Sequence, residues 1–275
     1  MAVFAQSRAL YEGLYKPHFG KGEEKAMYSK FYIFSYSFSS YWAVFAVGLL
    51  LMAVMNVLRR KRMEFSRLRA VLFTVLICFL SLAGAKILFA LENWQQFLDN
   101  GITLDGVSFF GAVFFLPSAM YFICRWRKVP YGAFMDYCAL SLMTMLAVLR
   151  IGCWLNGCCG GITIQTGAYA GTVVPVQIME CIGDLAILGV LLLVEWHYSG
   201  KGMLYPCILF LYGGLRFVLE FFRDTPKDWL YLSHGQWFSI VSAIAGVYFL
   251  RRIMKNILAE GSKKKESDKQ RKRRR

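Results

Sequence analysis

Seven apolar runs, each close to the length of a membrane-crossing helix, constrain this chain more than any other feature of its sequence. A bilayer core is crossed by about 20 mostly apolar residues in an α-helix. The runs span residues 36–58, 70–91, 107–124, 131–155, 176–196, 203–222 and 237–254. Because 57% of the 275 residues are hydrophobic, too little polar sequence remains to cover buried helices of a soluble protein. We therefore predict an all-α polytopic membrane protein with seven transmembrane helices.

The positions of the basic loops predict the orientation of the helices. Cations cluster in RRKRMEFSRLR after the first run, in RWRK after the third, and in the tail from Arg251 to Arg275. Basic loops stay in the cytoplasm under the positive-inside rule, and these segments outnumber the four lysines within the first 31 residues. We expect the N-terminus outside, with residues 1–35 as an extracytoplasmic arm, residues 36–254 as the membrane domain and residues 255–275 as a basic cytoplasmic tail.

The net charge of +15 and the tail SKKKESDKQRKRRR raise the question of a polyanionic partner. In a polytopic protein, anionic lipid headgroups explain such a tail, because each cation adds about 1 kcal/mol of attraction near the surface. Nucleic acid is therefore not expected as a partner. Solvated disorder of the tail is the other interpretation that stays open, and the same choice between membrane contact and disorder applies to the N-terminal arm.

Three cations inside the apolar runs predict an anionic ligand. A charged side chain within a span costs at least about 2.5–3.5 kcal/mol, so such residues tend to mark function. Arg150, Arg216 and Lys86 all stand near the outer ends of runs that are expected to cross outward. At 1.5 Å per residue, the two arginines lie within about 10 Å of those ends. The planar guanidinium fork suits phosphate, so an anionic phospholipid is the expected partner.

One acidic residue shares a helix face with the second arginine. Tyr212, Arg216 and Glu220 follow one another at i, i+4 spacing. Glu220 is therefore expected to hold the arginine in a structural ion pair rather than to act in catalysis.

Further acidic residues lie in the fourth and fifth runs. Glu180 and Asp184 repeat the i, i+4 spacing just after Gln177, and for Glu180 a structural and a catalytic role both stay open. Asp136 lies near the cytoplasmic end of its run. We expect it to pair with the basic cluster at residues 125–128.

The segment NGCCGG, from Asn156 to Gly161, opens an uncharged outer loop. Its glycines permit the positive φ values and close backbone approach of an anion-binding turn, although glycines are also common at helix ends. A thiol near Arg150 gains a lowered pKa, which makes Cys158 a candidate nucleophile or proton acceptor.

Other interpretations of Cys153, Cys158 and Cys159 stay open. A zinc site needs four N or S ligands and the three histidines are scattered, so no metal or cofactor is expected. A disulfide suits an oxidising outer face, but vicinal cysteines pair only with strain. Small apolar filling explains the other five cysteines and is possible for these three.

Several motifs resemble those of the prolipoprotein diacylglyceryl transferase family in order and spacing. They are LDGVSFFGAVF, LRIGCWLNGCCGG, VPVQIMECIGD, LYGGLRFVLEFFRDTP and HGQWFSI. The pattern Tyr-Gly-x-x-Arg-Phe-x-x-Glu-Phe-x-Arg, from Tyr212 to Arg223, is specific. Family members are bacterial inner-membrane enzymes with seven spans and an external N-terminus, which agrees with the topology predicted from the runs and loops.

The resemblance implies an activity and a site. Family members transfer the diacylglyceryl group of phosphatidylglycerol to the lipobox cysteine of a prolipoprotein and release glycerol 1-phosphate. Arg150 matches the arginine of the signature Gly-Arg-x-Gly-Asn, Arg216 the second essential arginine, Tyr212 its partner one turn earlier, and Gly161 the closing glycine. The candidate catalytic residues are Arg150, Arg216, Cys158 and Glu180; the candidate substrate-binding residues are Lys86, Asn156, Gly161, Gln177, Tyr212, Glu220 and Arg223.

This chain departs from the family pattern at four polar positions. Phe110 stands where the family has a histidine, Cys153 replaces the signature asparagine, Cys158 replaces a glutamate, and Val174 replaces a second histidine. The arginines are kept while the acid and base positions are changed.

Two main functions are compatible with this pattern. In a transferase, Cys158 or Glu180 accepts the proton of the incoming thiol, while the arginines stabilise the phosphate leaving group. The alternative is a non-catalytic homologue that binds anionic phospholipid or a lipoprotein precursor. A third, weaker hypothesis is thiol redox exchange at the outer face.

Overall fold

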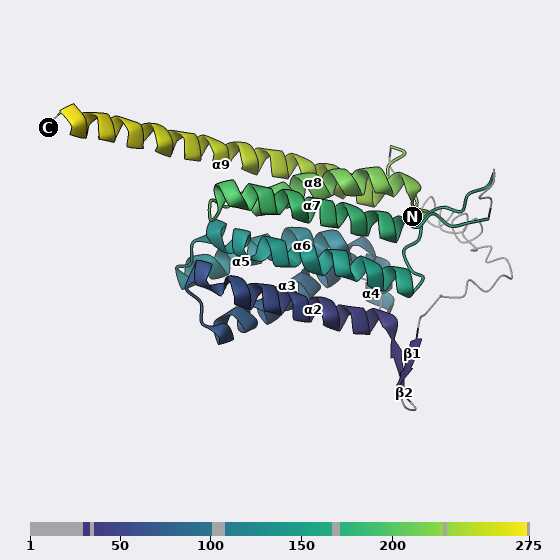
Figure 1. Ribbon diagram of the computed structural model, residues 1–275. Helices are drawn as coiled ribbons and strands as arrows, with labels where there is room; N and C mark the ends of the chain where they lie inside the picture. The colour runs from purple at the N-terminus through teal and green to yellow at the C-terminus, as the bar shows by residue number, and fades with distance from the viewer. Residues whose placement is uncertain (1–29, 34–35, 101–107, 167–170, 228–229, 274–275) are drawn as a thin grey trace.

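The computed structural model describes residues 30–33, 36–100, 108–166, 171–227 and 230–273. A short antiparallel hairpin precedes a bundle of helices that lie side by side (Figure 1). The elements are β1 (Lys30–Ile33), β2 (Tyr36–Ser39), α2 (Ser40–Arg59), the 3-10 turn η1 (Arg60–Met63), α3 (Arg67–Glu92), α4 (Trp94–Asn100), α5 (Phe109–Arg127), α6 (Tyr131–Leu155), α7 (Val176–Tyr198), α8 (Leu204–Leu219), the 3-10 turn η2 (Glu220–Phe222) and α9 (His234–Arg273).

The predicted set of membrane spans is confirmed within the described residues. Seven helices there are long and apolar enough to cross a membrane. The first span begins at Ser40 rather than at residue 36, because residues 36–39 form the second strand of the hairpin. The all-α prediction therefore holds for the bundle and misses this hairpin.

The C-terminal tail is helical rather than disordered as far as Arg273, and its contact with anionic headgroups stays a prediction. Helix α9 continues without a break from His234 to Arg273, and its last part projects away from the other helices (Figure 1). The sequence from Leu258 onward is rich in Lys, Glu, Gln and Arg, which favour helix even where no partner covers them.

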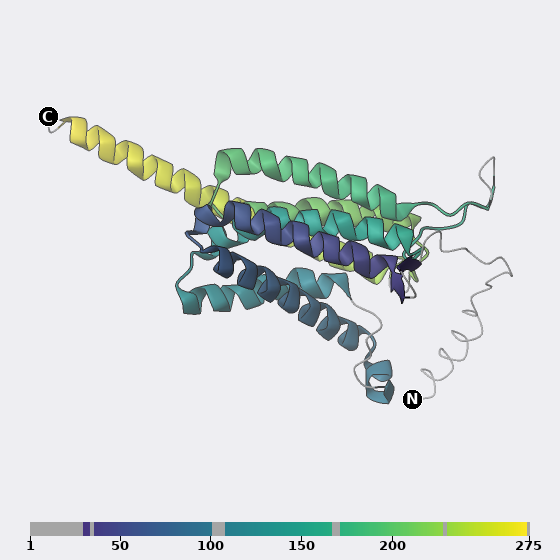
Figure 2. The ribbon, with the colours of Figure 1, turned by 60° about the horizontal axis from the view of Figure 1, so that its bottom comes forward.

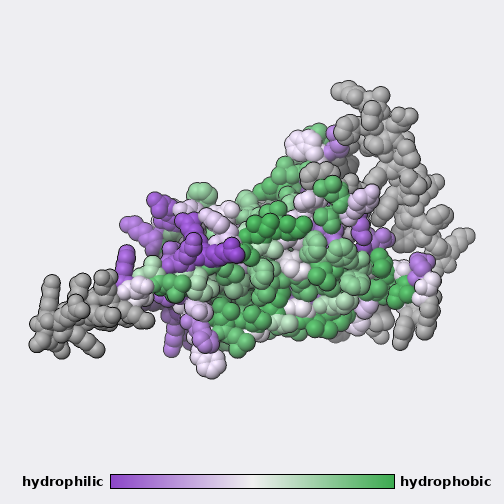
Figure 3. All heavy atoms as spheres, turned by 90° about the horizontal axis from the view of Figure 1, so that it is seen from above, coloured by the Kyte–Doolittle hydropathy of each residue, from purple (hydrophilic) through white to green (hydrophobic). Residues whose placement is uncertain are grey.

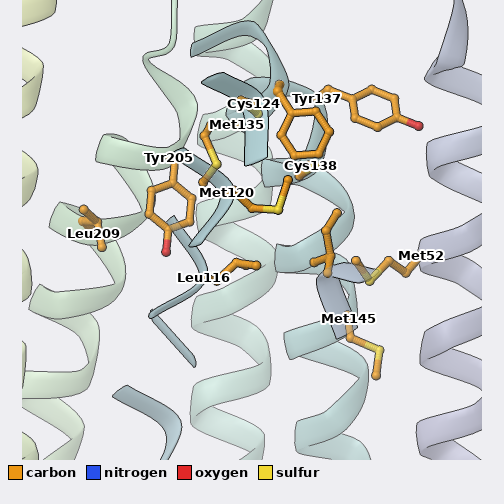
Figure 4. Packing of buried hydrophobic residues seen from close by; sticks show 12 residues of the cluster. Met52, Leu116, Met120, Cys124, Met135, Tyr137, Cys138, Met145, Tyr205 and Leu209 are labelled. Carbon is orange, nitrogen blue, oxygen red and sulfur yellow. The ribbon is translucent and has the colours of Figure 1, made fainter. Parts of the chain in front are cut away.

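Helix α6 is the central helix of the bundle. It packs against α2 on one side and α7 on the other, and also contacts α5 and α8 (Figures 1 and 2). Its middle is apolar on all faces, as expected for a helix that is covered on every side. Figure 4 shows Met120 of α5 and Tyr205 of α8 gathered with Met135 and Cys138 of α6, in the larger of the apolar clusters.

Polar contacts join the helices at the end of the bundle that carries the basic loops. Arg59 donates to Glu195 at 2.6 and 2.9 Å. The carboxylate of Asp136 accepts hydrogen bonds from the backbone N–H groups of Gly202 and Leu204, at 2.7 and 2.8 Å. The expected pairing of Asp136 with the basic cluster at residues 125–128 is therefore wrong. The carboxylate instead satisfies the unpaired N–H groups where α8 begins.

The outer surface of the bundle is apolar. Large hydrophobic side chains are exposed along several helices, among them Leu50, Phe79, Leu193 and Ile244. Figure 3 shows this apolar surface across the middle of the molecule, with hydrophilic residues gathered toward the ends. An exposed apolar surface of this extent fits contact with lipid.

Replacing Gly84 by valine is expected to lower the stability of the bundle. A Cβ atom at Gly84 of α3 would lie 2.4 Å from Cβ of Phe115 and 2.7 Å from the carbonyl oxygen of Gly111, both in α5. Overpacking of this kind costs about 1–3 kcal/mol. The measurement is thermal unfolding in detergent micelles. Gly189→Val is the matched control, because no atom lies within 4 Å of a Cβ there; equal losses in the two variants would contradict the prediction.

Candidate functional site

The candidate site lies at the end of the bundle opposite the Arg59–Glu195 contact. Arg150 stands in the last two turns of α6, Glu180 in the second turn of α7, and Arg216 in the last turn of α8. Helices α6 and α8 run in the same direction, and α7 runs against them. The two helix C-termini and the one N-terminus therefore lie at the same end of the bundle (Figure 1). The ion pairs of Glu180 with Arg150 and Arg216 show that the three side chains meet there.

Glu180 is the centre of the charge cluster. It is 0% exposed, and three arginines surround its carboxylate. Arg216 donates a hydrogen bond to Oε1, Nε of Arg150 lies 3.1 Å from Oε2, and Nη1 of Arg223 lies 3.8 Å from the same oxygen. Sequence reasoning left the role of Glu180 open. The geometry makes it the carboxylate that holds three guanidinium groups together.

Glu220 is the second buried carboxylate of the cluster. Its Oε2 lies 3.1 Å from Nη2 of Arg216, so the predicted i, i+4 ion pair is present. Its Oε1 accepts a hydrogen bond from the hydroxyl of Ser233 at 3.1 Å. A Cβ atom at Gly235 would lie 2.9 Å from this oxygen, so only glycine leaves room for the carboxylate. No sequence pattern identified Ser233, because it reaches Glu220 from a loop 13 residues away.

Tyr212 and Phe109 hold the guanidinium group of Arg150. Nη2 of Arg150 donates to the Tyr212 hydroxyl at 3.1 Å, and the guanidinium carbon lies 5.9 Å from the centre of the Phe109 ring. The two rings also pack on each other, with centroids 5.1 Å apart. Tyr212, expected beside Arg216 from its spacing, therefore makes its hydrogen bond to the other arginine.

The cluster retains hydrogen-bonding capacity that the protein does not use. Nε of Arg150 and Nη1 of Arg223 are buried and, although close to carboxylates, make no hydrogen bond of good geometry. Each guanidinium offers five N–H donors. The three arginines together therefore have more donors than the two carboxylates can accept. The arginine side chains are 12–14% exposed, so an incoming group can reach them. Spare cationic donors at the edge of a buried cluster suit a phosphate.

The loop after α6 folds back against the end of α8. The N–H of Gly161 donates to the carbonyl of Val174 at 2.9 Å, and the N–H of Ile162 donates to the carbonyl of Phe222 at 2.8 Å. A Cβ atom at Gly161 would lie 2.5 Å from that Phe222 oxygen, so the close approach requires glycine. Gly161 pairs in a β-bridge with Arg223, which places the loop directly beside the arginines.

The start of this loop is fixed by one amide. The side chain of Gln177 donates to the carbonyl of Cys158 at 2.7 Å, which ties the loop to the first turn of α7. Asn156 ends α6, and its N–H donates to the carbonyl of Gly152 at 3.0 Å. Both residues therefore position the loop that carries the thiols.

Three thiols gather in this loop. The sulfur atoms of Cys153, Cys158 and Cys159 all lie within 4.8 Å of one another. Cys153 is buried, Cys158 is half-buried and Cys159 is exposed, and all three are free. The pKa of the Cys159 thiol is lowered, because the adjoining thiols of Cys153 and Cys158 stabilise its thiolate and two arginines add positive charge. The sequence predicted no metal site because the histidines are scattered. The three thiols by themselves lie close enough together to hold one ion.

Aromatic contacts describe two further positions that the sequence analysis singled out. The ammonium of Lys86 lies over the Phe89 ring of its own helix, 6.0 Å from the centroid, so its convergence with the arginines stays a prediction. Phe110, which stands where the family has a histidine, is buried and stacks on Phe238 with centroids 5.3 Å apart. That position therefore contributes packing rather than a proton donor or acceptor.

Comparison with known proteins shows the family of this chain. The family model described as prolipoprotein diacylglyceryl transferase matches residues 29–252. A protein of Clostridium tetani named phosphatidylglycerol–prolipoprotein diacylglyceryl transferase is 23% identical over 234 residues, which cover 79% of this chain and 94% of the relative. A protein with the same name from Dehalococcoides mccartyi is 26% identical, and the match covers 62% of this chain and 72% of the relative. Another, from Chloroherpeton thalassium, is 33% identical, and the match covers 56% of this chain and 63% of the relative. The chain belongs to the prolipoprotein diacylglyceryl transferase family.

Proposed function

We propose that this protein transfers the diacylglyceryl group of phosphatidylglycerol to the cysteine thiol of a prolipoprotein. The observation that carries the proposal is the arrangement of Arg150, Arg216 and Arg223 around Glu180. The names of the relatives state this donor and this acceptor.

The charges of the cluster fit a phosphodiester. Three guanidinium groups carry three positive charges, and the ion-paired Glu180 and Glu220 carry two negative charges. The nearby Asp184 is buried with no hydrogen-bond partner for either oxygen, so we count it as uncharged, which leaves one positive charge. The phosphodiester of phosphatidylglycerol carries one negative charge. Its phosphate therefore completes the charge balance and takes up the spare N–H donors of Arg150 and Arg223.

The reaction follows from this placement of the phosphate. The acceptor sulfur forms a bond to the terminal glyceryl carbon, the bond from that carbon to the phosphate oxygen breaks, and the electron pair leaves with the oxygen as glycerol 1-phosphate. Negative charge grows on the leaving phosphate in the transition state. Donors that are already oriented toward it stabilise the transition state without reorganisation.

The site faces the outer leaflet of the bacterial inner membrane in this proposal. The basic residues after α2 and α5 lie at the opposite end of the bundle from the arginine cluster. Under the positive-inside rule that end is cytoplasmic, and the N-terminus is outside. The acceptor sequence then approaches from the external side, through the loop that carries the thiols.

A non-catalytic homologue is the second candidate function. Phe110 is packed among aromatic rings, and the cysteines at positions 153 and 158 replace two further polar residues of the family pattern. Such a protein retains the phosphate site and binds phosphatidylglycerol without turnover. The assay below separates the two functions.

Arg150→Ala and Arg216→Ala are each expected to reduce turnover by roughly 10²–10³, since each removes charge stabilisation from the leaving phosphate. The measurement is the release of glycerol phosphate from labelled phosphatidylglycerol in the presence of a lipobox peptide. Complementation of a transferase-depleted bacterium checks the result in cells. Arg127→Ala, at the opposite end of the bundle, serves as the control and should match the wild type.

Two results would contradict this prediction in different ways. Normal turnover by both arginine variants removes the assigned role of the cluster. Tight binding of phosphatidylglycerol by the wild type without any release of glycerol phosphate supports the non-catalytic homologue instead.

Glu180→Gln is expected to lower the free energy of unfolding and to make stability depend on anionic lipid. Removing one partner of a buried ion pair costs about 3–5 kcal/mol, because the guanidinium groups are left uncompensated. Phosphatidylglycerol supplies a negative charge in their midst. It should therefore raise the unfolding temperature of this variant more than that of the wild type, whereas phosphatidylcholine should not.

The matched control is Asp184→Asn, one helical turn further along α7. Asp184 is equally buried, but its carboxylate oxygens have no hydrogen-bond partner. Its neutralisation should leave the effect of phosphatidylglycerol unchanged. An equal lipid effect in the wild type and in Glu180→Gln would show that no phosphate enters the cluster.

A further inference from the structure

The thiol cluster of Cys153, Cys158 and Cys159 has the composition of a metal site with one open position. Catalytic zinc sites have three protein ligands and leave the fourth position for water or substrate, whereas structural sites use four. The sequence-based expectation of no metal applied the four-ligand requirement. Three cysteine sulfurs within 4.8 Å of one another are enough for a site with three protein ligands and one open position.

The geometry of the cluster is close to that of a bound ion. With Zn–S bonds of about 2.3 Å, two thiolates on one tetrahedral Zn²⁺ lie roughly 3.8 Å apart. The three sulfurs therefore need to approach one another by about 1 Å or less from the separations present. The turn that brings the thiols together has two residues with positive φ, Gly157 at +70° and Cys159 at +63°.

The surroundings of the cluster favour thiolates. Three thiolates and Zn²⁺ together carry one negative charge. Cys153 lies three residues after Arg150 on the same helix face, and Arg223 pairs with the loop at Gly161. Positive charge beside the thiols favours their thiolate form. Gln177 holds the carbonyl of Cys158. The thiol of Cys158 donates to the carbonyl of Cys153 at 3.7 Å, a weak contact that a thiolate on Zn²⁺ would give up.

The exposure of the sulfurs leaves a path to the ion. Cys153 is buried at the end of α6, whereas Cys159 is exposed and Cys158 is half-buried. A fourth ligand can therefore enter from the loop side, while the arginines lie on the helix side. This is the arrangement that the proposed reaction requires, with the acceptor thiol on one side and the donor phosphate on the other.

We propose that Cys153, Cys158 and Cys159 bind one Zn²⁺, and that its open position binds and deprotonates the acceptor cysteine of the prolipoprotein. The inference rests on the proposed transferase function and identifies what activates its nucleophile. A thiol that coordinates Zn²⁺ loses its proton outright. This activation replaces a general base, which fits the presence of Phe110 at the family's histidine position and of two of the cysteines at its other polar positions.

The step is balanced without an oxidant or reductant. The acceptor S–H proton passes to water at the exposed side of the loop, and the sulfur stays on Zn²⁺ as a thiolate. Its lone pair then forms the C–S bond, the C–O bond to phosphate breaks, and the thioether product leaves the ion as a weaker ligand. Zn²⁺ has no redox chemistry, so its charge is unchanged throughout.

The test begins with metal binding by the full-length protein in detergent. Elemental analysis should find a single Zn²⁺ per chain, and Co²⁺ substitution should give thiolate-to-metal absorption. Cys153→Ser, Cys158→Ser and Cys159→Ser should each lose the bound metal. Cys78→Ala, a half-buried cysteine in α3 outside the cluster, is the matched control and should retain it.

Acceptor binding is read from the Co²⁺ spectrum. A lipobox peptide should shift the absorption, since its thiolate becomes the fourth ligand, and the same peptide with serine in place of cysteine should not. Chelation should then lower glycerol phosphate release from phosphatidylglycerol, and Zn²⁺ should restore it.

The outcomes separate this inference from the transferase proposal. Turnover that survives chelation and all three serine substitutions would overturn the zinc site and leave the transferase intact. A peptide-dependent Co²⁺ spectrum in a protein that releases no glycerol phosphate would support the site and contradict the transferase. A disulfide among these cysteines, found after alkylation in intact cells, would also overturn the inference.

Discussion

The interaction between Glu180 and three arginines is the constraint on which the rest of this structure depends. A charge that leaves water for the interior of a helical bundle is costly unless it is paired and hydrogen-bonded. Glu180 pairs with Arg150 from α6, with Arg216 from α8, and with Arg223 just beyond η2. One carboxylate therefore joins the ends of three helices. The same pairing keeps three like charges close together, which no apolar packing could do.

The topology of the bundle makes that interaction possible. Helices that alternate in direction place the C-terminal turns of α6 and α8 beside the N-terminal turn of α7. At the opposite end, Asp136 accepts hydrogen bonds from the backbone at the start of α8, and Glu195 pairs with the guanidinium of Arg59. Each polar end is thus internally paired, and the apolar middle is left to packing around α6 and to lipid. Unused N–H donors remain at both ends: Nε of Arg59 at one, and Nε of Arg150 with Nη1 of Arg223 at the other.

The sequence predicted the parts of this arrangement that follow from hydrophobicity and helical spacing. The seven spans and the Arg216–Glu220 pair are of this kind, because length and i, i+4 geometry are local properties. The hairpin before α2 and the partner of Asp136 were missed. Backbone N–H groups leave no trace in a sequence, so a carboxylate that caps a distant helix resembles one that pairs with a nearby cation. The gathering of three thiols was likewise hidden, since it depends on the turn after α6.

The substituted family positions make physical sense when the site is divided into two halves. The arginine half must stabilise phosphate charge, and only guanidinium groups held by carboxylates supply several oriented cations at a buried depth. This half retains the family pattern. The thiol half must produce a nucleophile, and that task has more than one chemical solution: a base that takes the proton or an ion that displaces it. Phe110, stacked on Phe114 and Phe238, offers no proton acceptor at the position of the expected histidine, which fits the second solution. The cysteines at positions 153, 158 and 159 lie where that solution is needed, beside the arginines and open to the loop side.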